Sequence, residues 1–354
     1  MGFERIALQG AGGEWVPLVV RPPDPAGAHQ SFSQRLLMAA PDGEHLLYAA
    51  ARGQLRVRGP AGDEFPVDRV EERDARFSAD SRWLATVTAI GPDEDVRADV
   101  TVVDVTGHRR RSLGQVDRPM WLEWVRDGVV VLHVDAASGQ QALTYLPLAG
   151  RPRLLVTGHD LVPRFTAAAR GTRVMYFIDT DVFTMDVTGG EPERAGTLPD
   201  TAPNVEMSPD GSQAALATST RLYRWTEARG LEVLQDGEEI HTVWYSPGGH
   251  ELAYASRSAA VVLTDGGKRH ELRAPGNDLA GLRFRRGGDG LVVVRGDRVL
   301  LWRPAASELR TLAVGPPGQT VRAADVFAGG TALWTTTAAP PVPAANPPPS
   351  QQAR

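Results

Sequence analysis

The residues most able to do chemistry in this 354-residue chain are acidic side chains in the polar segments between apolar runs. Carboxylates gathered on one surface attract a basic peptide or a cation, because together they focus a negative potential. A divalent cation would additionally need several carboxylate oxygens to converge on one point. The competing interpretation is that they are ordinary solvated loop residues. The candidate partner-binding residues are Asp68, Glu71, Glu72, Asp74, Asp93, Glu94, Asp95, Asp117, Asp160, Asp200, Asp236, Glu238 and Glu239.

Motifs of known catalytic chemistry are missing from the sequence. It contains no G-x-S-x-G nucleophile elbow, no H-E-x-x-H zinc motif and no Walker phosphate loop. The eight histidines are scattered without the paired spacing of metal ligands, and the lack of cysteine excludes thiolate chemistry and disulfides. We therefore expect a protein that is not an enzyme, with no cofactor and no bound metal. The alternative is a propeller enzyme of the lactonase or lyase type, with a metal or an acid-base pair at a channel mouth.

The elements that must position these acids come from a repeated strand-turn-strand unit. Its clearest copy is Val205 to Thr218, with the turn Ser208-Pro209-Asp210-Gly211 at its centre. Pro209 presets φ, Asp210 can bond to nearby backbone, and Gly211 allows a positive φ. Related turns recur about every 40 residues from Gly43 to Gly330, a period typical of four-stranded propeller blades.

A second hairpin follows each of the first seven turns but not the eighth. The N-terminal stretch Arg5 to Val19 has the same strand-turn-strand pattern and can supply the two missing strands. We therefore predict an all-β fold: a single β-propeller over residues 1–337 with eight four-stranded blades, closed by pairing N-terminal with C-terminal strands. Seven blades with an N-terminal extension is the alternative count.

Propeller topology assigns the acidic segments and the repeated turns to opposite faces. The connections between blades share a face with the loops between second and third strands, whereas the inner hairpin turns lie on the other. Two insertions, 89–99 and 135–141, lengthen loops on the acidic face and could form a lip for a partner. Trp121, Trp124 and Trp244 fall on inner strands, near the channel.

Three of the repeats support a family comparison. Ser208-Pro209-Asp210-Gly211, Tyr245-Ser246-Pro247-Gly248-Gly249 and Phe77-Ser78-Ala79-Asp80-Ser81 are each followed by a short apolar run. These segments resemble TolB-type, WD40-like (PD40) propeller repeats, and the resemblance covers residues 3 to 337. It implies the propeller fold, and it implies function only loosely, because such propellers serve as scaffolds, peptide binders and accessory domains.

Composition restricts the class of partner. The formal net charge of -5 gives no reason to expect nucleic acid, and Arg109-Arg110-Arg111 is interpreted as a solvated hairpin tip. No apolar run is long enough to cross a bilayer and no secretory signal is present, so we expect a cytoplasmic protein without membrane contact. Residues 338–354, rich in Pro and Ala, are expected to form a disordered tail. The leading hypothesis is a monomeric, non-enzymatic scaffold that presents its inter-blade loop face to a protein or peptide partner; a subunit of a multi-protein bacterial system is one form of this hypothesis.

Overall fold

The computed structural model consists of β-strands with one short 3-10 helix among the residues it describes. The described residues are 4–9, 14–21, 37–50, 54–69, 75–90, 97–159, 161–202, 204–256, 259–273, 279–285, 288, 290–328 and 330–337. The predicted tail at 338–354 therefore lies outside them.

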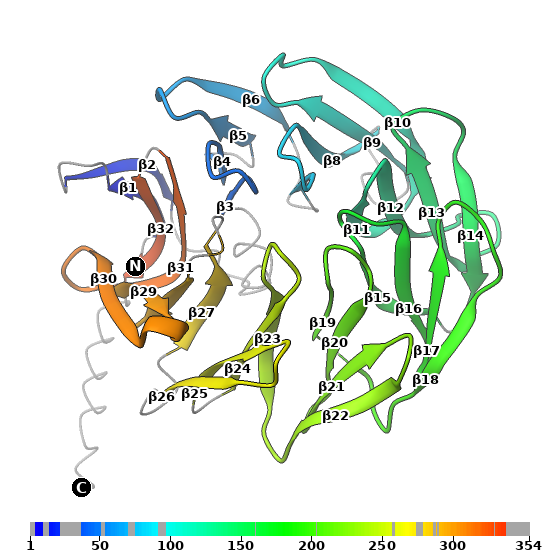
Figure 1. Ribbon diagram of the computed structural model, residues 1–354. Coiled ribbons are helices and arrows are strands. Elements are labelled where there is room, and N and C mark those ends of the chain that lie inside the picture. Colours follow the sequence, from blue (N-terminus) through cyan, green and yellow to red (C-terminus); the bar gives the residue numbers. More distant parts are fainter. Residues whose placement is uncertain are drawn as a thin grey trace, which may run out of the picture.

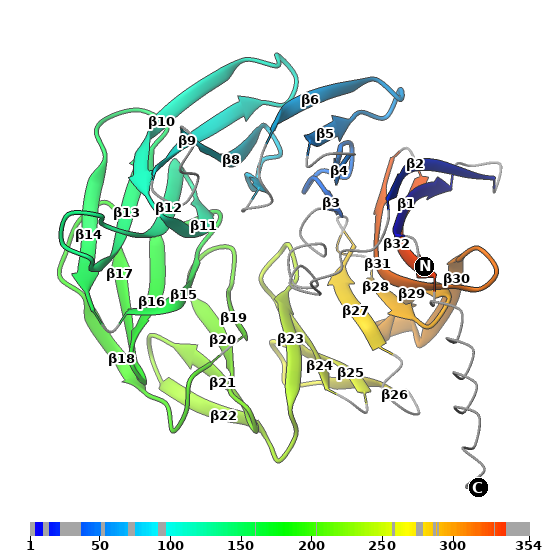
Figure 2. The ribbon, with the colours of Figure 1, turned by 180° about the vertical axis from the view of Figure 1, so that it is seen from behind.

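The described strands form eight four-stranded antiparallel sheets arranged in a ring, which confirms the predicted propeller and its blade count (Figures 1 and 2). In blades 1 to 7 the strands follow the chain from the inside of the ring outward. Blade 1 comprises β3 (Leu37–Ala39), β4 (Leu46–Ala49), β5 (Gln54–Arg58) and β6 (Glu64–Arg69). Blade 2 comprises β7 (Ala75–Phe77), β8 (Trp83–Ala89), β9 (Arg97–Asp104) and β10 (Arg110–Asp117). Blade 3 comprises β11 (Pro119–Val125), β12 (Gly128–Val134), β13 (Gln141–Pro147) and β14 (Arg153–Gly158).

The remaining consecutive blades repeat this plan. Blade 4 comprises β15 (Leu161–Ala167), β16 (Arg173–Ile178), β17 (Asp181–Asp186) and β18 (Glu193–Thr197), and blade 5 comprises β19 (Asn204–Met207), β20 (Gln213–Ala217), β21 (Arg221–Thr226) and β22 (Gly230–Asp236). Blade 6 comprises β23 (Ile240–Tyr245), β24 (Glu251–Ser256), β25 (Ala259–Thr264) and β26 (Arg269–Arg273). Blade 7 comprises β27 (Leu279–Phe284), β28 (Leu291–Arg295), β29 (Arg298–Arg303) and β30 (Glu308–Val314), with the 3-10 helix η2 (Pro304–Ala306) between its last two strands.

Blade 8 is shared between the two ends of the chain. Its inner strands are β31 (Gln319–Phe327) and β32 (Gly330–Thr337), and its outer strands are β1 (Glu4–Gln9) and β2 (Trp15–Arg21). β1 pairs antiparallel with β32, with Glu4 opposite Thr336 and Gln9 opposite Thr331. The N-terminal hairpin therefore closes the ring as predicted, and the edge of β32 is covered by a strand from the same chain.

The repeated turn is stabilised by the residues that define it. The Ser208 hydroxyl donates to Asp210 Oδ1 at 2.7 Å, and the same oxygen accepts the Ser212 N–H at 3.0 Å. Gly211 has a φ of 81°, in the left-handed region that favours glycine. Asp210 is thus occupied within its own turn, as a turn-forming residue and not as a ligand.

Eight apolar clusters hold the ring together, one between each pair of neighbouring blades. They arise because side chains alternate between the two faces of each strand. The cluster between blades 3 and 4 includes the fully buried Phe165 and Val130, from different blades. Each such side chain contributes about 1.5–3 kcal/mol on burial, so the ring is stabilised mainly at its blade interfaces.

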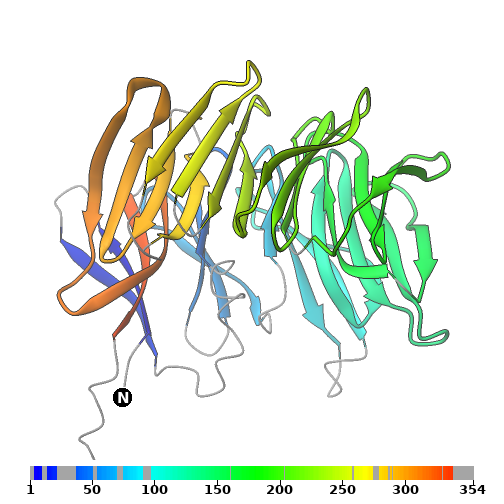
Figure 3. The ribbon, with the colours of Figure 1, turned by 90° about the horizontal axis from the view of Figure 1, so that it is seen from below.

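Turns and loops gather on the two opposite faces of the ring, because the strands run between these faces (Figure 3). We call the face with the inter-blade connections and the loops between second and third strands the loop face. The face with the turns between first and second, and between third and fourth, strands is the turn face. On the turn face the two turns of a blade lie side by side, as the hydrogen bond from Val105 N–H to the Arg82 carbonyl shows (2.9 Å).

Candidate functional site

The predicted acidic residues that the structure describes lie apart around the loop face. Asp117 ends β10, Asp200 lies between blades 4 and 5, and Asp236, Glu238 and Glu239 lie between blades 5 and 6. Asp68 lies in β6, and nothing is described of its side chain. The other predicted acids fall outside the described residues: Glu71, Glu72, Asp74, Asp93, Glu94, Asp95 and Asp160.

The described acids have local partners. Asp117 Oδ2 accepts the Ala136 N–H at 3.3 Å, and Asp200 Oδ2 accepts the Ser219 hydroxyl at 2.9 Å. Asp236 Oδ1 lies 2.8 Å from Arg221 Nε, and this hydrogen bond lowers the pKa of the Asp236 carboxyl. Among the residues that the structure describes, no three His, Asp or Glu side chains are placed to hold a metal ion. The acidic rim remains a prediction, with its described members distributed and not convergent.

The insertion at 135–141 forms an ordered turn on the loop face. Asp135 accepts the Ser138 N–H at 3.1 Å, and its own N–H donates to the Gln140 carbonyl at 2.8 Å. Gly139 has a φ of 68°. The turn therefore presents a fixed surface beside Asp117, which suits the predicted lip; of the other insertion, residues 91–96 lie outside the described residues.

The structure brings together a second set of residues, charged and aromatic, on the inner strands around the axis of the ring. We call this set the inner belt. Its members come from seven of the eight inner strands. They are Arg76 (β7), Trp121 and Glu123 (β11), Arg164 (β15), Glu206 (β19), Trp244 (β23), Arg283 (β27) and Asp325 (β31).

One half of the inner belt is built around Trp121 and Glu123. Glu123 Oε1 accepts the Trp121 Nε1–H at 2.8 Å and lies 3.5 Å from Arg76 Nη2. The guanidinium of Arg164 lies 4.9 Å from the centre of the Trp121 ring, and that of Arg76 lies 5.8 Å from it. Both distances are within the range of cation–π attraction. These contacts join blades 2, 3 and 4 at the axis.

The other half of the inner belt is centred on Asp325, which is 2% exposed. Asp325 Oδ2 accepts hydrogen bonds from Arg283 Nη1 at 2.7 Å and from the Ala39 N–H at 2.8 Å. The Arg283 guanidinium also lies 5.2 Å from the centre of the Trp244 ring. Because these residues belong to blades 1, 6, 7 and 8, this half of the belt also closes the ring at its junction.

Glu206 differs from the other acids of the belt because its carboxyl forms no hydrogen bond or ion pair with any described residue. Burial raises its pKa to about 8; Glu123 raises it further, whereas Arg76 and Arg283 act in the opposite direction. Glu206 is half-buried. At neutral pH it is mostly a neutral acid, able to donate a hydrogen bond or a proton.

The strand register shows why Glu206 is isolated. Across blade 5 it stands opposite Ala215, which stands opposite Arg224. These residues share the sheet face toward blade 6, but the small Ala215 separates Glu206 from Arg224, whose Nη2 is 3.2 Å from Glu232 on the other side. On the facing blade, Tyr245 is 8% exposed and its hydroxyl, like Arg224 Nε, is buried without a hydrogen-bond partner.

Sequence reasoning missed the inner belt, apart from placing Trp121 and Trp244 near the channel. Trp124, predicted there too, instead packs between blades 2 and 3 and donates from Nε1 to the Arg76 carbonyl at 2.7 Å. The signal for the belt was a charged residue within several of the short apolar inner strands, as in Val205-Glu206-Met207 and Leu282-Arg283-Phe284. Only the closed ring brings such positions together.

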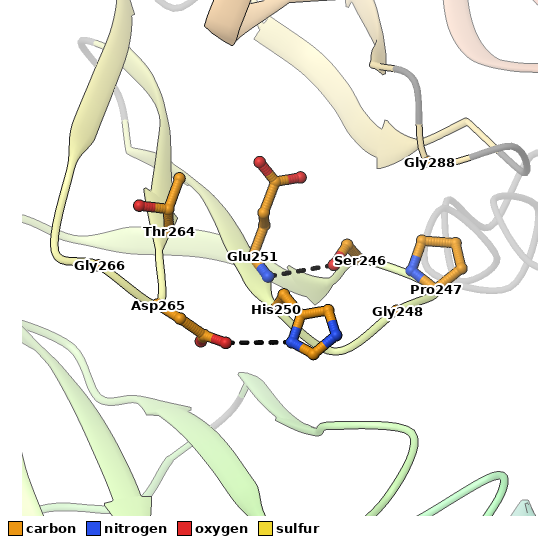
Figure 4. Close-up of a pocket in the computed structure, with 9 residues that line it drawn as sticks. All are labelled: Ser246, Pro247, Gly248, His250, Glu251, Thr264, Asp265, Gly266 and Gly288. Carbon is orange, nitrogen blue, oxygen red and sulfur yellow. Dashed lines mark hydrogen bonds and ion pairs between the residues drawn. The ribbon is translucent and has the colours of Figure 1, made fainter.

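A shallow pocket of about 540 Å³ on the turn face contains Ser, His and Asp side chains (Figure 4). His250 Nδ1 lies 3.1 Å from Asp265 Oδ2, as in a hydrolase triad. The Ser246 hydroxyl, however, accepts the Glu251 N–H at 3.1 Å and forms no hydrogen bond with His250. The His250 side chain is 81% exposed. The arrangement therefore lacks the serine–histidine hydrogen bond that activates a nucleophile.

Comparisons with known proteins agree on the fold alone. No known family profile matches the chain, and no curated protein matches it in sequence. A crystal structure of a eukaryotic initiation factor is similar, with a TM-score of 0.55 and 10% identity over 94% of this chain and 98% of that one. A protein from Bacteroides uniformis assigned as a 6-phosphogluconolactonase gives a TM-score of 0.48 and 15% identity, over 74% of this chain and 92% of that one.

Within the described part of the chain, no helix has the length and apolar character needed to span a membrane.

Proposed function

We propose that this protein is a non-enzymatic scaffold that binds a protein or peptide partner at the inner belt. The observation that carries the proposal is the convergence of charged and aromatic side chains from seven inner strands on the axis of one ring. Aromatic and arginine side chains are enriched where binding energy is concentrated in protein interfaces. Partly exposed guanidiniums stacked on indole rings are already ordered, which lowers the entropic cost of binding.

The partner is proposed to be a peptide segment or a loop of another protein, within a multi-protein bacterial system in the cytoplasm. The Asp135 turn and the acidic residues of the loop face would contact the parts of the partner that remain outside the ring. Membership in the TolB-type, WD40-like family is proposed on the repeats quoted above. The likeness to the initiation factor supports the propeller fold and carries no functional argument at 10% identity.

Affinity purification from the native host, with mass spectrometry of what is retained, tests the proposal. The wild-type protein should retain a reproducible partner, and Trp121→Ala should lose it, because this change removes the ring on which Arg164 stacks and the donor to Glu123. Arg229→Ser is a matched control on the turn face, where Arg229 forms only an exposed pair with Glu232. Recovery of the bare monomer from gentle, cross-linked preparations would contradict the proposal, as would equal retention by wild type and Trp121→Ala.

One observation favours the alternative, a propeller enzyme of the lactonase or lyase type. A general acid works best with a pKa near the operating pH, and the pKa of Glu206, about 8, meets that condition. The alternative predicts that Glu206→Gln abolishes turnover of a lactone or polysaccharide substrate while leaving partner retention unchanged. A melting temperature raised by Ca²⁺ or Mg²⁺ would also favour it.

A further inference from the structure

The turn face of blades 2 and 3 carries a concentration of positive charge, although the chain as a whole is acidic. Its four turns, together with the strand ends beside them, contain seven arginines against three aspartates, all within the continuously described parts of the chain. The corresponding turns of blades 5 and 6 have four acids against three bases. The seven arginines are Arg82, Arg109, Arg110, Arg111, Arg126, Arg151 and Arg153.

These arginines differ in their pairing from several arginines of blades 4 to 7. There, Arg194 lies 2.6 Å from Asp181 and Arg303 lies 2.9 Å from Glu308. Arg110 has further contacts. For the other arginines of the basic turns, no ion pair with a described acid is present. The local aspartates are used by their own turns: Asp104, for example, accepts N–H groups of Thr106 and Gly107. The guanidiniums of Arg82, Arg109 and Arg111 therefore have no ion-pair partner among the described acids and are available to a partner.

The hairpin that carries Arg109 to Arg111 is exposed, as expected from sequence, and contacts with blade 1 also fix it in place. Arg110 Nη2 donates to the Pro66 carbonyl of blade 1 at 2.9 Å, and the His108 ring stacks on Phe65 with 4.0 Å between centroids. His108 has a φ of 53°, a left-handed conformation that the turn requires. These contacts anchor one side of the hairpin and leave Arg109 and Arg111 on the side toward blade 3.

Trp83 lies at the centre of the basic surface. The guanidiniums of Arg82 and Arg111 lie 5.3 Å and 5.6 Å from the centre of its ring. Trp83 and Leu148 of blade 3 both pack against the apolar cluster between blades 2 and 3, so the indole lies at the junction of the two blades. A guanidinium stacked on an indole keeps its forked N–H groups directed outward, in the geometry that suits a carboxylate.

We propose that the turn face of blades 2 and 3, around Trp83, is a second binding surface that receives an acidic segment of a partner protein, rich in Asp and Glu. This surface is separate from the inner belt and does not depend on the function proposed for it. Carboxylates are the expected ligands because two guanidiniums, those of Arg82 and Arg111, lie around the Trp83 ring and form no ion pair with a described acid. A nucleic acid is disfavoured, because the net charge of -5 repels a long polyanion and the basic surface spans only two blades.

Fluorescence anisotropy with a labelled peptide of alternating Glu and Ser residues tests this. The wild-type protein should bind it, and more weakly at about 200 mM than at about 50 mM salt, as screening requires. The variant Arg82→Ser/Arg109→Ser/Arg111→Ser should bind at least about tenfold more weakly. The matched control Arg194→Ser/Arg229→Ser/Arg298→Ser removes the same charge from exposed, ion-paired sites and should bind as wild type does.

Melting curves of both variants establish that they fold. Equal weakening in the two variants would overturn the proposal, because it would show an effect of net charge alone. Absence of peptide binding at low salt would also overturn it. Tighter binding of an oligothymidine than of the acidic peptide, lost in the first variant, would overturn it in favour of a nucleic acid.

Discussion

The strongest single test of how this ring is closed is Asp325→Ala. Asp325 lies on the inner strand of blade 8 and receives hydrogen bonds from Arg283 of blade 7 and from the backbone of Ala39 in blade 1. Its carboxylate is therefore the one described group that joins the last consecutive blade, the shared blade and the first blade. Because it is 2% exposed, solvent cannot replace these bonds without a rearrangement.

The expected cost follows mainly from the two bonds to neighbouring blades that are lost. Removing one partner of a buried ion pair costs about 3–5 kcal/mol, mostly because the remaining charge is left uncompensated. Part of that cost is the Ala39 N–H left without an acceptor, about 1–3 kcal/mol. Asp325→Asn keeps an acceptor but presents no charge to Arg283, so we expect about 1.5–3 kcal/mol. The double variant Asp325→Ala/Arg283→Met should recover part of the loss, since no uncompensated charge remains.

Urea unfolding, followed by tryptophan fluorescence, measures these differences through the midpoint and slope of each curve. The matched control is Glu308→Ala, which breaks the Arg303–Glu308 pair at 2.9 Å, whose side chains are 34% and 43% exposed. An exposed pair contributes at most about 1 kcal/mol. A cost for Asp325→Ala no larger than that of Glu308→Ala would refute the reasoning, and so would a double variant less stable than Asp325→Ala alone.

Three further predictions concern other parts of the ring. Tyr245→Phe should leave the free energy of unfolding unchanged or raise it by about 1 kcal/mol, because the buried Tyr245 hydroxyl has no partner. Tyr254→Phe should lower the free energy of unfolding by about 1 kcal/mol, because it removes the acceptor that lies 2.6 Å from Arg269 Nη1. Equal losses in the two variants would refute this contrast. The stability that the neutral Glu206 carboxyl contributes is complete below its ordinary pKa of 4.5 and is lost as pH rises toward its folded pKa of about 8. The urea midpoint of the wild type should therefore fall relative to that of Glu206→Gln between these two pH values. Parallel pH profiles of the two proteins would contradict this. Deleting residues 1–21, which removes β1 and β2, should lower the melting temperature far more than deleting residues 340–354, and equal melting temperatures would contradict closure by the N-terminal hairpin.

The architecture could be predicted because the same local sequence determinants recur in each repeat. Each inner hairpin needs a turn such as Ser208-Pro209-Asp210-Gly211, and local chemistry determines that turn wherever it occurs. The sharing of blade 8 also followed from counting hairpins at the two ends of the chain. Neither inference required knowledge of which side chains meet across the ring.

The inner belt could not be predicted in this way, because its contacts join residues that are far apart in the chain. Arg76 meets Glu123, which lies 47 positions further on, and Arg283 meets Asp325, which lies 42 further on. Such pairs resemble ordinary surface charges in the sequence. The candidate acids of the loop face illustrate the opposite case: sequence identified the residues, whereas Asp236 proves to be held by Arg221 of its own blade.

The two proposed binding surfaces follow from the same property of a propeller. A position in the repeat corresponds to a fixed place in the ring, so a charge at one repeat position becomes a charge on one face. Arg82 and Arg126 occupy inner turns of successive blades, and therefore lie on the turn face, whereas Asp117 and Asp200 occupy connections and lie on the loop face. Substitutions that leave the turns and apolar strands intact can thus change either surface without disturbing the ring. We therefore expect the loss of the turn-face arginines to alter binding at blades 2 and 3 while leaving retention of a partner at the inner belt unchanged, and simultaneous loss of both would show that the two surfaces form one interface.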